Sequence, residues 1–558
     1  MTRFTQQTTT SSVKSAALFV PLVLAAALLL SLPAATQAQF YFGKNKVQYA
    51  SFDWQVMTTE HFRIYFYEDE AEIAKVAARI AEDAYRPLAK KFNHEWRRRV
   101  PLIIYSAPRY FAQTNVVPGL LPESVGGFTE FMKGRVVVPF HGSYFDFKHV
   151  IVHEMVHVFM LSKLAHEMDK QRRARAVYPP LWFTEGIAEF WSESWDTEAD
   201  MIIKDMVIQG RLPRIPDFWR FHGSYFMYKL GQAVCEFIEA EYGSDKLTYI
   251  FDNWSRGRDF DHIIELSLGD NLEELSRKWE YSLKKRYFPQ MADYDLPAME
   301  SKRITRDGYS LKGVPIDWDN GEGETEWIVY MAHRLGYAGI YLKPRKPTTD
   351  GRQTLVKGER SIKFESLHLL RSGIDATDSG LVVFSSKSKD RDVVYIYDLN
   401  QMKITREFPI DELVSVRSPQ FSPDHRTIVF TGIRRSGYAD LFELTMATGD
   451  VRALTNDIYN DIDPTYSDDG ERVVFASDRC EGGNAGATNL YELDLTTKAL
   501  RQLTWGDFND QTPDVTERGI FFSSDREDSY NLFLLADDGS ITRQSTYVTG
   551  AFDPRLSP

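Results

Sequence analysis

Two patterns of hydrophobic and polar residues divide the chain near residue 300. Between residues 47 and 295, short apolar runs of strand type alternate with longer segments of helical period. The runs HFRIYFY, PLIIYS and GRVVVPF are of the first kind, and EIAKVAARIAEDAYRPLAKKF and GQAVCEFIEAEYG are of the second. From residue 301 onward helical periodicity nearly vanishes. The patterns predict a mixed α+β domain over residues 39–300 and an all-β domain over residues 301–558.

The all-β part repeats one order of turns and strands. Each copy begins with a proline and a turn, and then has a strand, a turn of the Ser-Asp-Arg type and a second strand. Pro419, Pro464, Pro513 and Pro554 recur at 45, 49 and 41 residues, which is typical of one four-stranded propeller blade. We expect four or five blades. The acidic turn residues Asp478 and Asp525 are expected to accept backbone hydrogen bonds and not to bind a ligand.

These repeats resemble the TolB-type β-propeller over residues 364–558, and less closely over residues 301–363. A propeller implies a binding surface for protein partners but no particular reaction. The last residues, AFDPRLSP, begin a further copy and stop within it. We expect a truncated propeller; the alternative is that this segment completes the first blade.

The first 38 residues have the pattern of an export signal. Arg3 and Lys14 precede an apolar stretch from Ala16 to Leu30, and Thr36-Gln37-Ala38 offers small residues for cleavage. The apolar stretch is short for a bilayer span, which needs about 20 residues. We therefore expect a signal peptide over residues 1–38 and a periplasmic or extracellular protein without a membrane span.

Charge and cysteine content narrow the possible partners. The net charge of −13 argues against nucleic acid as the main partner, because phosphate-binding surfaces need an excess of lysine and arginine. The two cysteines, Cys235 and Cys480, fall in different predicted domains, so we expect no disulfide framework.

The stretch VIVHEMVHVFM, residues 150–160, contains the strongest chemical signal. His153 and His157 are four residues apart and share one face of a helix, with Glu154 at its edge. An ordinary core helix does not explain Glu154, because an unpaired charge is costly to bury in an apolar run. The pattern predicts a zinc site. His149 extends the same face, and we expect it to be a flanking contact.

The third zinc ligand is expected on the segment PPLWFTEGIAEFWS, residues 179–192. Glu185 and Glu189 are one turn apart there, and spacing alone does not separate them. Here the chain resembles the gluzincin metallopeptidases of the aminopeptidase N-like and peptidase MA-like group, whose second motif Glu185-Gly186-Ile187-Ala188 matches. The resemblance implies a zincin-type domain in which Zn²⁺ is bound by His153, His157 and Glu185.

The same resemblance assigns roles to the neighbours of the metal. Glu154 is the expected general base, and Glu189 is expected to accept a hydrogen bond from a ligand imidazole, unless it is a solvated helix residue. Gly186 is expected to let its helix approach the one that carries the histidines. The spacing between the two motifs is longer than in aminopeptidase N relatives, so we expect residues 161–180 to form a loop over the cleft.

Two weaker similarities concern substrate and transition state. Tyr228 lies three residues before Gly231, as does the transition-state tyrosine in the family's Tyr-x-Lys-Gly stretch. The lysine of that stretch is displaced by one position here, to Lys229. Tyr225 and His222 are alternative candidates for the role of this tyrosine. A partial match to the family's exopeptidase motif, whose glutamate binds a substrate amino terminus, is found at Gly127-Phe128-Thr129-Glu130. The alternative is that Glu130 belongs to an ordinary loop at the start of a strand and binds no substrate. The strand from Arg135 to Phe140 is expected to be an edge that could pair with extended peptide.

Together these observations predict an exported zinc metallopeptidase that hydrolyses peptide or protein substrates, with the propeller as a binding or gating module. The competing hypothesis is a non-catalytic envelope scaffold with a structural zinc module. A serine peptidase is not supported, because Gly308-Tyr309-Ser310-Leu311-Lys312 lacks the last glycine of the nucleophile pattern.

Overall fold

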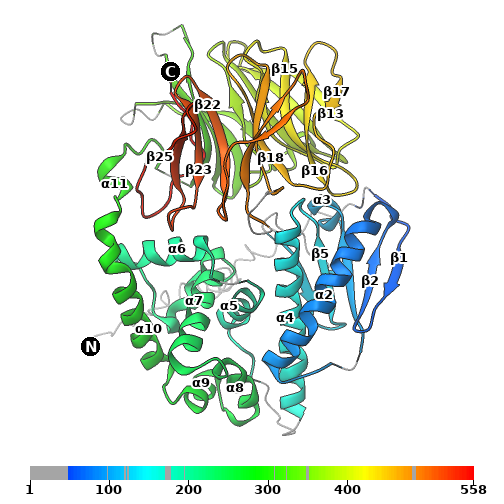
Figure 1. Ribbon diagram of the computed structural model, residues 1–558, viewed down its shortest axis with the longest axis vertical. Helices are drawn as coiled ribbons and strands as arrows, with labels where there is room; N and C mark the ends of the chain where they lie inside the picture. Colours follow the sequence, from blue (N-terminus) through cyan, green and yellow to red (C-terminus); the bar gives the residue numbers. More distant parts are fainter. Residues whose placement is uncertain are drawn as a thin grey trace, which may run out of the picture. The chain divides into compact units, whose positions relative to one another are not determined.

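The computed structural model describes residues 48–557 apart from residues 49, 97, 118–120, 122–124, 170–176, 194, 307, 322, 324, 347–350 and 480–485. The predicted signal peptide and Cys480 lie outside the described residues. Within them the chain has an α-rich mixed domain followed by a β-propeller (Figure 1). No helix in this part of the chain is both long and apolar enough to cross a membrane.

The first domain is built on a five-stranded mixed sheet with the order β1-β2-β3-β5-β4. Its central pairs, β2 with β3 and β3 with β5, are parallel, and both edge strands are antiparallel to their neighbours. The strands are β1 (Gln55–Thr58), β2 (Phe62–Phe66), β3 (Val100–Tyr105), β4 (Phe128–Glu130) and β5 (Arg135–Pro139). The three predicted apolar runs are confirmed as β2, β3 and β5. The expectation that residues 135–140 form an edge is wrong, because β5 pairs on both sides and β4 is the edge.

Two long helices, α2 (Ala71–Phe92) and α4 (Tyr144–Asp169), lie beside this sheet (Figure 1). In α2 the buried residues recur every three or four positions, as in Ala74, Ala77 and Ala81, and Asn93 ends the helix in a left-handed conformation. In α4 every residue from Ile151 to Met160 is buried, so this helix runs through the core. The expected loop over residues 161–180 is partly wrong, since α4 continues to Asp169.

The rest of the first domain is helical. Its α-helices are α3 (Pro108–Phe111), α5 (Leu181–Ser192), α6 (Thr197–Ile208), α7 (Tyr225–Tyr242), α8 (Lys246–Asp252), α9 (Phe260–Leu268), α10 (Leu272–Tyr287) and α11 (Pro297–Glu300). Short 3-10 helices are η2 (Glu68–Glu70), η3 (Ile215–Phe221), η4 (Trp254–Arg256) and η5 (Phe288–Asp293). The second predicted helical segment is confirmed as part of α7. One hydrophobic core joins the helices from α5 to α10 to the sheet and to α4.

Within the described part of residues 309–557, five four-stranded antiparallel sheets follow along the chain, each a simple meander, so the larger expected number of blades is confirmed. Between consecutive sheets lie hydrophobic clusters that hold neighbouring blades together. The blades comprise β6 (Tyr309–Asp317), β7 (Glu326–Arg334), β8 (Tyr337–Pro344) and β9 (Gln353–Lys357); β10 (Asp375–Ala376), β11 (Leu381–Ser388), β12 (Arg391–Asp398) and β13 (Lys403–Ile410); β14 (Ser415–Phe421), β15 (Thr427–Ile433), β16 (Ala439–Thr445) and β17 (Val451–Ala453); β18 (Asp461–Tyr466), β19 (Arg472–Ser477), β20 (Asn489–Asp494) and β21 (Leu500–Gln502); and β22 (Asp510–Thr516), β23 (Gly519–Ser524), β24 (Asn531–Leu535) and β25 (Ile541–Arg543). A further 3-10 helix, η6 (Ile362–Phe364), precedes the second blade.

The recurring prolines of the sequence mark a bulge in the first strand of the later blades. Ser418, Asp463 and Thr512 each precede such a proline, have φ near +50° and lie at a break in strand register. These residues line one pocket together with Lys312 and Asp553, which form an ion pair of 2.5 Å. The alternative that residues 551–558 complete the first blade is wrong, because that blade has its four strands within residues 309–357.

Candidate metal centre

Three side chains from two helices converge on one point. α4 presents His153 and His157 one turn apart, because residues four apart share a helix face. α5 brings Glu185 against them. The two Nε2 atoms lie 3.2 Å apart, and Glu185 Oε2 lies 3.3 Å from His153 Nε2 and 3.2 Å from His157 Nε2. The three atoms therefore form a nearly equilateral triangle.

This triangle has the size that a zinc ion needs. Ligand atoms about 2.0–2.1 Å from zinc in a tetrahedral arrangement lie about 3.3–3.4 Å from one another. Two imidazoles and one carboxylate are also a common donor set of catalytic zinc sites, in which water or substrate takes the fourth position. His153, His157 and Glu185 therefore fit zinc in both distance and chemistry.

Strong electrostatic coupling links these groups when no cation lies between them. Burial opposes the ionisation of Glu185, but the charges of His157 and His153 and their hydrogen bonds lower its pKa to about 2. Burial likewise lowers the pKa of His153, but its contacts with Glu185 and Glu189 raise that pKa to about 10. A cluster that attracts positive charge so strongly is suited to a divalent cation.

Glu154 lies beside the triangle and is held by the edge of the sheet. Its carboxylate Oε2 accepts a hydrogen bond of 2.7 Å from the Thr129 hydroxyl, which lies 3.1 Å from the Glu154 backbone carbonyl. Thr129 is the middle residue of β4, and both residues are buried. The edge strand thus fixes the direction of the Glu154 carboxylate. The sequence interpretation missed Thr129, because it considered the segment Gly127–Glu130 only for Glu130.

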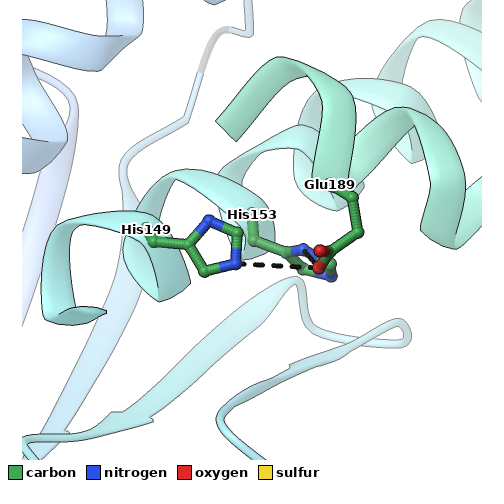
Figure 2. Close-up of side chains that lie close together, drawn as sticks. All are labelled: His149, His153 and Glu189. Atoms are coloured by element: carbon green, nitrogen blue, oxygen red, sulfur yellow. Dashed lines mark ion pairs between the residues drawn. The ribbon is translucent and has the colours of Figure 1, made fainter. Parts of the chain in front are cut away.

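A second group of side chains, His149, His153 and Glu189, lies next to the first (Figure 2). Glu189 Oε1 lies 3.1 Å from His153 Nδ1 and 3.6 Å from His149 Nε2. The His153 ring N–H is not aligned with the carboxylate oxygen, so their contact is an ion pair and not a well-formed hydrogen bond. His149 also contacts Glu193 at 3.3 Å. His153 therefore faces one carboxylate with each ring nitrogen.

Lys229 of α7 neutralises this second group. Its Nζ lies 3.0 Å from Glu189 Oε2 and 2.7 Å from Asp196 Oδ2, and its side chain is only 4% exposed. Burial opposes the ionisation of Glu189, but His149, His153 and Lys229 hold its pKa well below the usual range. Glu189 is thus a buried, ionised group with fixed partners, and its alternative assignment as a solvated helix residue is wrong.

Tyr228 also belongs to the centre. Its ring is nearly parallel to that of His153, with centroids 6.2 Å apart. Burial raises the pKa of its hydroxyl, and the negative charges of Glu185 and Glu154 raise it further. The rival Tyr225 is half exposed and donates its hydroxyl hydrogen to Glu198, while His222 ends η3 before α7 begins. The structure therefore groups Tyr228 with the predicted metal ligands.

Gly186 has a different neighbour from the one expected. A methyl group at Gly186 would lie 2.3 Å from the carbonyl carbon of Gly231, so this glycine brings α5 against α7 and not against α4. The prediction of a glycine-mediated approach to the histidine helix is therefore wrong. The glycines instead bring Glu185 and Tyr228 together from two helices.

Glu130 lies at the end of β4 and is occupied by its own hairpin. Its carboxylate accepts hydrogen bonds from the backbone N–H groups of Met132 and Lys133, and from Arg135 Nε at 3.0 Å. These hydrogen bonds, against the opposing effect of burial, lower its pKa. The structure does not group Glu130 with the three converging ligands, and its contacts favour the strand-loop alternative.

The acidic groups of the propeller have structural partners. Asp478 and Asp525 accept backbone hydrogen bonds from Asn460 and Asn509, at 2.8 and 2.6 Å, as predicted. A further acidic cluster contains Asp440, Asp457 and Asp461. It is paired with Arg434, which lies 2.5 Å from Asp440, and with Arg479, which makes two contacts of 2.6 Å with Asp461. These arginines leave the first domain as the place where metal chemistry is favoured.

Comparison with known proteins concerns the propeller. Residues 372–558 match the family of the TolB beta propeller domain. TolB from Acinetobacter baumannii is 14% identical, with 52% of this chain and 74% of that chain covered and a TM-score of 0.36. A puromycin-hydrolysing peptidase of Mycobacterium tuberculosis is 12% identical, with 44% of this chain and 39% of that chain covered and a TM-score of 0.31.

One chain from a structural analysis of two prolyl endopeptidases is 13% identical, with 49% of this chain and 42% of that chain covered and a TM-score of 0.30. This chain therefore spans less than half of the length of these peptidases. Taken with the five blades, the family match shows that the C-terminal part of the chain is a TolB-like β-propeller.

Proposed function

We propose that the first domain is a zinc-dependent metallopeptidase and that the propeller is its binding or gating module. One observation carries the proposal: His153, His157 and Glu185 place their ligand atoms in a triangle with edges of 3.2 to 3.3 Å. That is the arrangement of three protein ligands around a tetrahedral zinc ion. When bound there, zinc would lower the pKa of a water molecule and polarise the scissile carbonyl.

The side chains around the triangle supply the remaining chemistry. Glu154 takes the proton of the attacking water and passes it to the leaving amine. Its hydrogen bond from Thr129 holds the carboxylate in one orientation. Tyr228 donates a hydrogen bond to the developing oxyanion, and its raised pKa keeps the hydroxyl protonated at neutral pH. Base and oxyanion donor therefore come from different elements, α4 and α7.

The edge strand β4 provides a place for an extended substrate. Among the residues that the structure describes, it pairs only with β5, so its outer side can accept a further strand. Thr129 lies on this strand and contacts Glu154, which places the strand beside the general base. A peptide that pairs with β4 would thus pass next to the proposed metal. Export by the segment 1–38 remains part of the proposal.

A direct test is hydrolysis of a mixed peptide library by the purified full chain. We expect cleavage that a chelator abolishes and added zinc restores. Glu154→Gln keeps the shape of the side chain but removes its basicity, so zinc content should persist while hydrolysis falls by orders of magnitude. Bound zinc without cleavage, in the wild type and the variant alike, would favour the scaffold with a structural zinc module.

A further inference from the structure

His153 belongs to two candidate metal clusters at once. One contains His157 and Glu185 on its Nε2 side. The other, which Figure 2 shows, contains His149 and Glu189 near its Nδ1. In each cluster the ligand atoms lie within 4.8 Å of one another. Donor type and spacing alone would therefore allow a divalent cation in either place. A feature outside the two clusters must decide between them.

Lys229 distinguishes the two carboxylates. Its ammonium lies 3.0 Å from Glu189 Oε2, whereas Glu185 forms ion pairs only with His153 and His157 among the described residues. A divalent cation bound to Glu189 would lie within a few ångströms of a buried positive charge, where Coulomb repulsion is screened only weakly. Among the described residues no lysine or arginine forms an ion pair with Glu185, so a cation that binds this carboxylate displaces no such partner.

The position of Lys229 is well fixed. Asp196 Oδ2 holds the same ammonium at 2.7 Å, and the lysine side chain is 4% exposed. Two residues further along α7, Gly231 contacts Gly186, which follows Glu185 on α5. The close approach of the two helices therefore sets the lysine against Glu189, one turn after Glu185. The lysine cannot turn into solvent without leaving the buried carboxylate of Glu189 and the partly buried carboxylate of Asp196 without its charge.

On the basis of the proposed zinc site, we propose that Lys229 is a positioning residue that confines the metal to the Glu185 side of His153. It takes the place of a second cation at Glu189 and keeps that carboxylate as a partner of the His153 ring. The cluster of His149, His153 and Glu189 thus has the ligands of a metal site, and the ammonium group of Lys229 excludes a cation from it.

A rescue experiment in the full chain tests this role, with zinc content measured by elemental analysis after dialysis. Glu185→Ala alone should lose zinc. Combined with Lys229→Met, it should regain about one equivalent, because Glu189 is released as a ligand, and a further Glu189→Ala should remove it again. Cobalt in place of zinc should give a visible spectrum that differs from that of the wild type, since the ligands differ.

Two controls separate charge from general disruption. Lys229→Arg keeps the positive charge, so its combination with Glu185→Ala should stay without zinc. Lys163 is an equally buried lysine on α4, paired with Glu167 and Asp252 at 3.2 and 2.5 Å, and its substitution by Met should not rescue. Lys229→Gln removes the charge but keeps a hydrogen-bond donor, and it serves as the second neutral variant if the methionine disturbs folding.

The outcomes are distinct. If both neutral variants fold, as shown by near-UV circular dichroism, and neither restores zinc to Glu185→Ala, the role of Lys229 is refuted. The proposed function still stands in that case, provided that the wild type binds zinc and loses it on Glu185→Ala. A wild type that binds no zinc would overturn both proposals together.

Discussion

Gly186 on α5 and Gly231 on α7 bring two helix backbones into direct contact. A methyl group on Gly186 would lie 2.3 Å from the Gly231 carbonyl carbon, and one on Gly231 would lie 2.1 Å from the Trp182 carbonyl oxygen. Glu185 precedes the first glycine, and Tyr228 lies three residues before the second. This one contact therefore sets the distance between a proposed metal ligand and the proposed oxyanion donor.

Gly186→Ala should consequently damage both stability and metal binding. The added methyl has no space, so α5 and α7 must separate, and overpacking of this kind costs about 1–3 kcal/mol. We expect a lower thermal midpoint and weaker zinc binding. Gly126→Ala is the matched control, because its methyl would meet only Val150 at an ordinary 3.5 Å. Equal effects of the two substitutions would contradict this role of Gly186.

The two glutamates of α5 should differ in their effect on zinc. Glu185→Ala removes a ligand and should yield protein without metal. Glu189→Ala removes the partner of His153 Nδ1, a loss that typically costs about 10- to 100-fold in affinity or activity, so zinc should remain near one equivalent. Elemental analysis of both variants decides the question, and the reverse pattern would make Glu189 the third ligand.

Tyr228→Phe should lower kcat while leaving zinc content unchanged. The loss of one oxyanion donor typically costs about 100-fold or more. Tyr225→Phe is a suitable comparison, because its hydroxyl contacts Glu198 and its ring is half exposed. A large loss of kcat in the Tyr225 variant, with little change in the Tyr228 variant, would transfer the role to Tyr225.

Thr129→Val should slow catalysis through the orientation of Glu154. The substitution keeps the shape of the side chain and removes the hydrogen bond of 2.7 Å to the carboxylate. A hydrogen bond to a charged group contributes about 1.5–3 kcal/mol, so kcat should fall by about tenfold or more at constant zinc content. Thr129→Ser retains the hydroxyl and should keep most of the activity. If valine and serine behave alike, the hydroxyl has no part in catalysis.

Glu70→Gln should change how stability depends on pH. Burial raises the pKa of Glu70 from 4.5 to about 9, so the folded protein holds a proton that the unfolded chain releases. Between these two values, stability therefore falls with rising pH by about 1.4 kcal/mol per unit through this group. The glutamine variant lacks this slope. Its free energy of unfolding in urea, relative to that of the wild type, should therefore rise from pH 5.5 to 8. A constant difference would show that Glu70 is ionised in the folded state.

The sequence by itself determined where several strands and helices lie, and it named His153 and His157 as candidate metal ligands; Glu185 was separated from Glu189 only by the family resemblance. The short apolar runs of strand type became β2, β3 and β5, and the proline repeat became the bulges of the propeller blades, because apolar runs and turn residues are local signals. His153 and His157 were predictable for the same reason, since the helical repeat alone puts residues four apart on one face.

Only the tertiary structure decided what surrounds that triangle. β5 became an interior strand because β4 pairs with its far side, and pairing partners are not encoded in a strand's own pattern. Gly186 faces α7, Lys229 neutralises Glu189 and Thr129 holds Glu154, although these partners lie 25 to 45 residues apart in the chain. Such contacts arise from the packing of whole helices against one another and against the sheet, and no local periodicity records which faces meet.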